Sequence, residues 1–200
     1  MFNNPADILS VVLRGAMGRS GRKRARRATN FLTGEGGFLT ASSVLAAAGV
    51  AWGIYDGVKG QDVPQLPRGA VVPPIPVLQM IRLAVSASRA DGELSALERE
   101  QILSRARAAG LEAMLEPELA QTSRPLAEIV EGITDSAAGK EFYTLAFTIV
   151  RADEVVTGGE RIYLAQLAHC LGLDPATVAA IEAETTAKID AQPDTEQVRR

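Results

Sequence analysis

Hydrophobic side chains recur at helical spacing through the C-terminal part of the chain, and two stretches of this pattern repeat each other. Leu83-Ala84 and Arg89-Ala90-Asp91 return 62 residues later as Leu145-Ala146 and Arg151-Ala152-Asp153. In each copy an apolar helical face leads into a short acidic turn and then into a second helix. Alternating strand patterns are nearly absent, so residues 77–190 are predicted to form an all-α bundle of about seven helices with an internal pseudo-two-fold repeat.

Start and stop signals divide the bundle in the same way. Gly110 and Gly172 fall where helices should end, because glycine readily adopts the left-handed conformation that follows a last helical turn. Asp174-Pro175 combines an N-cap side chain with a proline in the first turn, which predicts the start of the last helix. Residues 191–200 are expected to form a disordered tail.

A run of uncharged residues precedes the predicted bundle. Gly36 to Tyr55 comprises twenty residues without a charge. At about 1.5 Å per residue, a helix of that length covers roughly the 30 Å of a bilayer core. Trp52 and Tyr55 lie near one end, where amphipathic rings prefer the membrane interface. We therefore predict a transmembrane helix over 36–58, with a buried soluble helix as the alternative because small residues dilute the run.

Small residues and prolines characterise the end of this run and the segment after it. Gly49, Gly53 and Gly57 recur at four-residue spacing, which favours close approach of two helices in lipid and hence a homo-oligomer. Five prolines follow within residues 59–76, a composition that favours extended chain over helix. This segment is predicted to be a Pro-rich linker between the membrane and the bundle.

A basic cluster lies before the uncharged run, within a predicted N-terminal arm over 1–35. Its members are Arg19, Arg22, Lys23, Arg24, Arg26 and Arg27. Such a cluster can retain the N-terminus in the cytoplasm, bind anionic lipid or contact nucleic acid. Its proximity to the uncharged run favours the first two interpretations. The chain is thus expected to be a single-pass protein of the bacterial inner membrane, with its C-terminal domain periplasmic by charge bias.

The charge balance reverses along the chain, although the net charge is only -3. Basic residues outnumber acidic ones before the bundle, and acidic residues outnumber basic ones within it. The acidic bundle would therefore repel a phosphate backbone. A single cysteine, Cys170, excludes an internal disulfide, and the single histidine, His169, makes a zinc site improbable. Without a histidine-based pair, a nucleophile motif or a phosphate loop, no enzymatic activity is expected.

The acidic turns are the candidate metal site. One contributes Asp91, Glu93 and Glu98, and the other contributes Asp153, Glu154 and Glu160. Carboxylate oxygens suit a hard divalent cation such as calcium, although neither turn has the twelve-residue calcium-loop pattern. Helix capping is the alternative, because Ser95 with Glu98 and Thr157 with Glu160 both match the capping box.

The repeated acidic turns also carry a family resemblance. The segment from Arg89 to Glu98 and the segment from Glu160 to Pro175 resemble the tellurite-resistance TerB-like family. The order of uncharged segment, linker and bundle over residues 36–190 resembles its inner-membrane, YebE-like branch. In the second turn Glu154 replaces the family's glycine. The resemblance implies a bundle of helices, acidic clusters that hold divalent metal in soluble members, a link to membrane stress responses, and no catalysis.

These observations lead to one expected function and one rival. We expect a membrane-anchored interaction or stress-sensing module that recognises a still unidentified protein partner and binds a divalent cation weakly through its acidic turns. The rival is a soluble nucleic-acid-associated protein that uses the basic N-terminal arm.

Overall fold

The computed structural model describes residues 23–34, 36–43, 75–90, 92, 96–108, 112–121, 124–152 and 156–193, and every regular element among them is helical. The helices are α2 (Lys23–Thr33), α3 (Phe38–Ala41), α5 (Ile75–Ala87), α6 (Ala96–Ala108), α7 (Glu112–Ala120), α8 (Leu126–Ile129), α9 (Ser136–Val150), α10 (Gly158–Cys170) and α11 (Pro175–Asp190). The predicted all-α class is confirmed. Among these described helices, none combines the length and the hydropathy needed to cross a bilayer.

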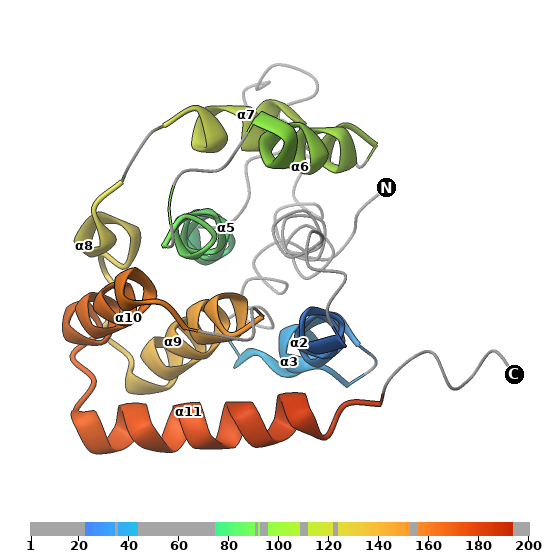
Figure 1. Cartoon of the computed structure of the whole chain (residues 1–200). Helices are drawn as coiled ribbons and strands as arrows, with labels where there is room; N and C mark the ends of the chain where they lie inside the picture. The colour runs from blue at the N-terminus through green and yellow to red at the C-terminus, as the bar shows by residue number, and fades with distance from the viewer. Residues whose placement is uncertain are drawn as a thin grey trace, which may run out of the picture.

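The helices stack in successive rows (Figure 1). α11 runs along one edge and packs on α2 and α9, and α9 in turn packs on α5. On the far side, α5 contacts α7 and α8, while α6 packs on α7. Helix α5 therefore lies in the interior of the fold, which explains why its sequence is apolar around most of its girth.

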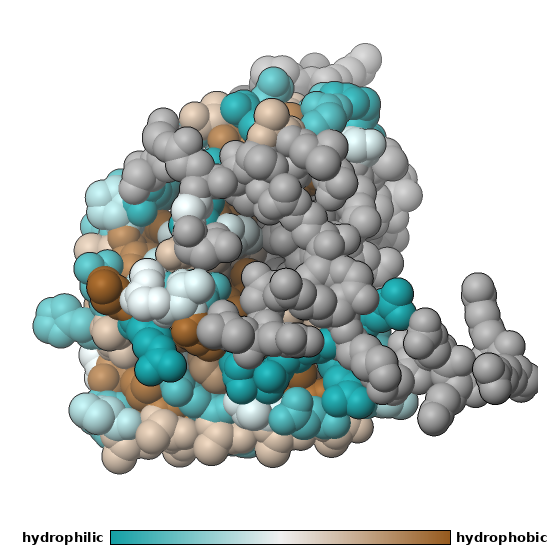
Figure 2. Space-filling model, in the orientation of Figure 1, coloured by the Kyte–Doolittle hydropathy of each residue, from teal (hydrophilic) through white to brown (hydrophobic). Residues whose placement is uncertain are grey.

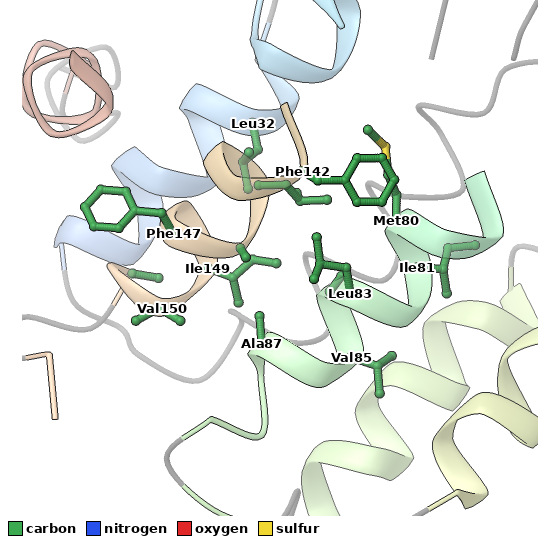
Figure 3. Close-up of a cluster of buried hydrophobic side chains, with 14 of the residues drawn as sticks. Leu32, Met80, Ile81, Leu83, Val85, Ala87, Phe142, Phe147, Ile149 and Val150 are labelled. Atoms are coloured by element: carbon green, nitrogen blue, oxygen red, sulfur yellow. The ribbon is translucent and has the colours of Figure 1, made fainter. Parts of the chain in front are cut away.

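The core forms mainly between α5 and α9. Figure 3 shows Met80 and Leu83 of α5 directed toward Phe142 and Ile149 of α9, with Leu32 of α2 close by. Phe142 is only 1% exposed, and Met80, Leu83 and Leu32 are fully buried. Three segments far apart in sequence thus share one apolar cluster, and its burial is the main stabilising contribution to this part of the fold.

Local signals fix the helix ends much as the sequence predicts. Asp174 accepts hydrogen bonds from the backbone N–H groups of Ala176 and Thr177, both at 2.9 Å, and Pro175 occupies the first turn of α11. Gly172 has a φ of 65° directly after α10, so the predicted glycine stop is confirmed. Helix α5 begins at Ile75, two residues earlier than expected, because Pro76 is tolerated in a first helical turn.

The basic N-terminal segment differs from the separate arm that the sequence suggests. Helix α2, which carries four of the basic residues, packs on α9 and α11. Its Ala25, Ala28 and Leu32 are buried, and Arg24 forms an ion pair with Asp190 at 3.6 Å. The basic charges lie on one side of an amphipathic helix whose small apolar side is part of the bundle.

The uncharged run likewise begins within the bundle. Helix α3 ends at Ala41, where Ser42 adopts an extended conformation with φ -65° and ψ 123°, so the described residues do not form one helix from residue 36 onward. Leu39 and Ser42 are each 3% exposed. Ser42 donates a hydrogen bond to Glu141, and the Ser43 backbone N–H donates to the same carboxylate at 2.8 Å. The rest of the predicted span, including Gly49, Gly53 and Gly57, lies outside the described residues, as do the linker from 59 to 74 and the tail from 194.

The two repeated segments are both helix, turn, helix, but they do not pack alike. α9 and α10 contact each other closely, whereas α6 packs chiefly on α7 instead of on α5. Between them, the single-turn helix α8 contacts both α5 and α10. The pseudo-two-fold repeat is therefore not established by the packing of the described helices.

Helix α11 closes the fold on one side and presents a weakly hydrophobic outer surface. Its Thr185 and Ile189 are buried against the bundle. Its alanines at 176, 179, 180, 183 and 187 are exposed. Figure 2 shows a pale brown band along its lower edge, where α11 runs in Figure 1. The alternation of buried and exposed positions follows the helical period, as a surface helix requires.

Candidate functional site

The tertiary structure brings the first repeated turn against the start of α10, the helix that follows the second turn. A Cβ atom placed on Gly159, at the start of α10, would lie 3.0 Å from the carbonyl oxygen of Ala90 in the first turn. Contacts this short with a backbone atom are rare, so a glycine at this position lets the turns meet. Glu160 directly follows Gly159 in the sequence and therefore lies next to this contact.

Glu160 is the one predicted metal ligand whose side chain is described, and it caps α10. Its carboxylate Oε2 accepts from the Thr157 backbone N–H at 2.6 Å, and the Thr157 hydroxyl accepts from the Glu160 backbone N–H at 3.2 Å. The predicted capping box is confirmed here. Glu160 is only 5% exposed, and no cationic side chain among the described residues pairs with it.

The remaining candidate ligands cannot be placed in the same detail. Asp91, Glu93, Asp153 and Glu154 lie outside the described residues, and Glu98 falls on α6 with its side chain outside them. Within the part of the chain that is described, no three acidic, histidine or cysteine side chains gather as a metal site would require. His169 and Cys170 are exposed neighbours at the end of α10.

Beside the first turn lies a charged cluster that the sequence analysis missed. Arg82 of α5 donates from Nε and Nη2 to Oε1 of Glu118 on α7, at 3.0 and 2.9 Å. Arg124, in the segment after α7, approaches Oε2 of Glu118 at 3.5 Å and donates to Glu128 as well. Glu118 is 11% exposed, so this carboxylate lies between two guanidinium groups away from most solvent. Such enclosed pairs are stronger than ion pairs at the surface.

Arg89 extends this cluster toward the first turn. Its guanidinium donates to the carbonyl oxygens of Gln121 at 2.6 Å and Leu119 at 2.9 Å, near the C-terminal end of α7. A cation at this position satisfies carbonyl groups that have no partner within the helix and complements its dipole. The repeated arginine of the first motif thus ties α5 to α7.

These side chains surround a hollow of about 410 Å³. Its charged and polar lining includes Arg82, Arg89, Glu118, Arg124 and Tyr163, and Ala90 and Gly92 of the first turn form part of its rim. Val85, Leu126 and Ile129 supply apolar surface. The volume falls within the usual range of small-molecule sites. A signal was present in the sequence, because Arg82 and Arg89 are seven residues apart and therefore share one helical face, but Glu118 and Arg124 join them only through folding.

A second polar contact lies on the opposite side of α10. The Tyr143 hydroxyl donates to Glu182 of α11 at 2.7 Å, although Tyr143 is only 1% exposed. Burial, followed by this hydrogen bond, raises the pKa of Tyr143 well above its ordinary value. The pair fastens α9 to α11 and has the character of a structural contact.

Comparison with known families assigns the chain to the TerB-like class of proteins. More particularly, the family model described as "Protein of unknown function (DUF533)" matches residues 9–185, so the chain belongs to this family. The matched range includes α2 and α3, in agreement with their packing on the bundle. No curated protein and no solved structure matches the chain.

Proposed function

We propose that the protein is a non-catalytic, TerB-like interaction or stress-sensing module whose two acidic turns jointly hold a divalent cation. The observation that carries this proposal is the contact between the turns, in which Gly159 lies against the carbonyl oxygen of Ala90. We infer that this contact would bring the carboxylates of the two segments, which repeat each other at an offset of 62 residues, toward one region. A cation shared between them would strengthen the junction only when it is bound, which is what a sensing module needs.

The donor set fits a hard cation such as calcium. Asp91, Glu93 and Glu98 would supply oxygens from the first turn, and Asp153, Glu154 and Glu160 from the second. Glu160 uses Oε2 for capping, and its Oε1 would coordinate the cation. Its buried carboxylate, which has no described cationic partner, is a group that a bound cation would stabilise.

Calcium titration of the full chain, followed by calorimetry and thermal unfolding, tests the proposal. Glu160→Gln keeps the capping box but removes the charge, so its stability without calcium should match the wild type while its calcium affinity falls about tenfold. Glu160→Ala should also lose about 1 kcal/mol of stability because the cap is lost. Glu184→Gln, on the exposed part of α11 beside Lys188, is the matched control and should bind calcium normally.

Two outcomes would count against cation binding. If millimolar calcium neither releases heat nor raises the melting temperature, the turns hold no cation of this kind. If Glu160→Gln binds calcium as tightly as the wild type, Glu160 is a cap alone and the shared site is refuted for the second turn.

We further infer attachment to the bacterial inner membrane, as in the YebE-like branch, through the uncharged run within 36–58. The docking of Leu39 and Ser42 sets a condition on this proposal. If residues up to Ser43 remain on the bundle, the uncharged residues from Val44 to Tyr55 number twelve, which as a helix reach about 18 Å and fall short of a bilayer core of about 30 Å. A full span therefore requires α3 to leave the bundle.

Fractionation of cells tests this attachment. Wild-type protein should require detergent for extraction, and Glu141→Ala, which removes the carboxylate that holds Ser42 and Ser43, should increase the membrane fraction. Lys140→Ala is the neighbouring control. Release by salt alone would contradict a span and favour electrostatic binding to anionic lipid or nucleic acid. Two observations disfavour the nucleic-acid alternative: α2 is packed on the bundle, and Arg24 is paired with Asp190.

A further inference from the structure

The hollow beside α5 contains two buried donors that lack a partner. In the described part of the chain, Nε of Arg124 and the hydroxyl of Tyr163 are both enclosed without a hydrogen bond. Burial raises the pKa of Tyr163 above its ordinary value, and the neighbouring Ser86 hydroxyl, the smaller influence, lowers it. Unpaired buried polar groups are uncommon because each costs free energy, so two on one lining require an explanation.

The electrostatic character of the lining indicates what these donors would receive. Arg82, Arg89 and Arg124 contribute three guanidinium groups, and Glu118 contributes the one carboxylate among the described lining residues. Nε of arginine can only donate, and a tyrosine with a raised pKa remains protonated and can donate as well. The complementary group is therefore an acceptor with negative charge.

The apolar wall limits the rest of the ligand. Val85, Leu126 and Ile129 face the same hollow as the arginines. Ile129 is 1% exposed and Val85 4%, so this wall is a rigid part of the core. A fully hydrated ion would leave such surface unused, whereas a molecule with an apolar body and a charged end would cover it.

We propose that the hollow between α5, α7, α8 and α10 binds a small organic carboxylate with an apolar body. The guanidinium groups of Arg82 and Arg124 and the hydroxyl of Tyr163 would hold its carboxylate, and the wall of Val85, Leu126 and Ile129 would hold its apolar part. A planar carboxylate matches the paired donors of a guanidinium. The two unpartnered donors are covered by neighbouring atoms, so binding includes small side-chain shifts that expose them to the ligand.

Benzoate is a suitable probe, measured with the full chain in metal-free buffer so that the result is independent of the acidic turns. Calorimetry should show one site of millimolar or tighter affinity. Benzamide, which has the same ring and shape without the charge, should bind at least tenfold more weakly. Phenyl phosphate tests the other common anion and should bind no more tightly than benzoate.

Two conservative variants connect the binding to the hollow. Tyr163→Phe removes only the unpartnered hydroxyl, so the melting temperature should be unchanged or higher while benzoate affinity falls about tenfold. Arg124→Lys keeps the charge but removes Nε and the planar fork, and should weaken benzoate by a similar factor. Tyr143→Phe is the matched control, because its hydroxyl pairs with Glu182 outside the hollow; it should bind benzoate normally.

Four results would overturn the proposal. Equal affinity for benzoate and benzamide would mean that the hollow selects an apolar ring and not an anion. Tighter binding of phenyl phosphate would assign the site to phosphate. Absence of benzoate binding to folded wild-type protein would mean that the hollow takes no such carboxylate. Undiminished binding to both variants would mean that benzoate binds without these two donors.

Discussion

Replacement of Gly159 by alanine tests the contact between the two turns, with Gly158→Ala as its control. The two glycines are consecutive at the start of α10, and neither has a positive φ. A Cβ atom on Gly158 would meet nothing within 4 Å, whereas one on Gly159 would lie 3.0 Å from the carbonyl oxygen of Ala90. The two positions therefore differ in that the first turn lies close to Gly159 and not to Gly158.

The expected stability changes have opposite signs. Gly158→Ala restricts the unfolded chain and should stabilise the protein by about 0.4–1 kcal/mol, or roughly 1–4 °C in melting temperature. Gly159→Ala has the same benefit but forces the Ala90 carbonyl to move. That carbonyl belongs to a turn held by hydrogen bonds from Ala90 N–H to Ala87 at 3.2 Å and from Gly92 N–H to Arg89 at 3.0 Å. The overpacking cost of about 1–3 kcal/mol should leave a net loss.

Urea unfolding followed by circular dichroism measures both variants on the same scale. Calcium titration of each then shows whether separation of the turns weakens the shared site, as we expect for Gly159→Ala alone. If Gly159→Ala is as stable as Gly158→Ala and binds calcium equally well, the two turns do not meet in solution. The argument for a joint cation site would then be lost.

Three further predictions concern the core and two titrating side chains. Phe142→Ala should destabilise the protein by about 3–5 kcal/mol, because the ring is 1% exposed between α5 and α9, and a loss below 1 kcal/mol in urea unfolding would contradict this packing. Hydrogen bonds from Thr177 lower the pKa of the Asp174 carboxyl. The stability that this carboxylate adds to the fold is therefore present above about pH 4 and lost as the pH falls further. The melting-temperature difference between wild type and Asp174→Asn should shrink from pH 5 toward about pH 2. Burial raises the pKa of Tyr143. The stability that its protonated hydroxyl adds to the fold is therefore present below about pH 10 and lost as the pH rises. A difference in unfolding free energy between wild type and Tyr143→Phe that stays constant to about pH 11 would refute this.

Much of the helical architecture could be predicted because its signals are local. The period of the apolar residues indicates α5, α9 and α10, and the residues that start α10 and α11 can be recognised within four positions. The charged hollow could not be predicted in the same way. Glu118 and Arg124 have no local relation to Arg82, and only the packing of α5 on α7 places them together.

The packing of the N-terminal segment is a second feature that the sequence could not predict. A basic cluster followed by an uncharged run has the composition of a membrane anchor. Composition does not indicate whether lipid or protein covers an apolar face. In the tertiary structure Leu32 and Leu39 are covered by the bundle, and Glu141, a residue about a hundred positions away, satisfies Ser42 and Ser43. A lipid bilayer and a protein core both accept apolar side chains, so hydropathy by itself does not distinguish them.

The sequence by itself determined the helical class, several helix ends and the position of the acidic turns, because these depend on residues within one or two helical turns of each other. The tertiary structure alone decided that α2 and α3 belong to the bundle, that Gly159 meets Ala90, and that three arginines enclose one hollow. Those features depend on contacts between residues far apart in the chain. Their free energy comes from burial and charge pairing that exist only after the chain has folded.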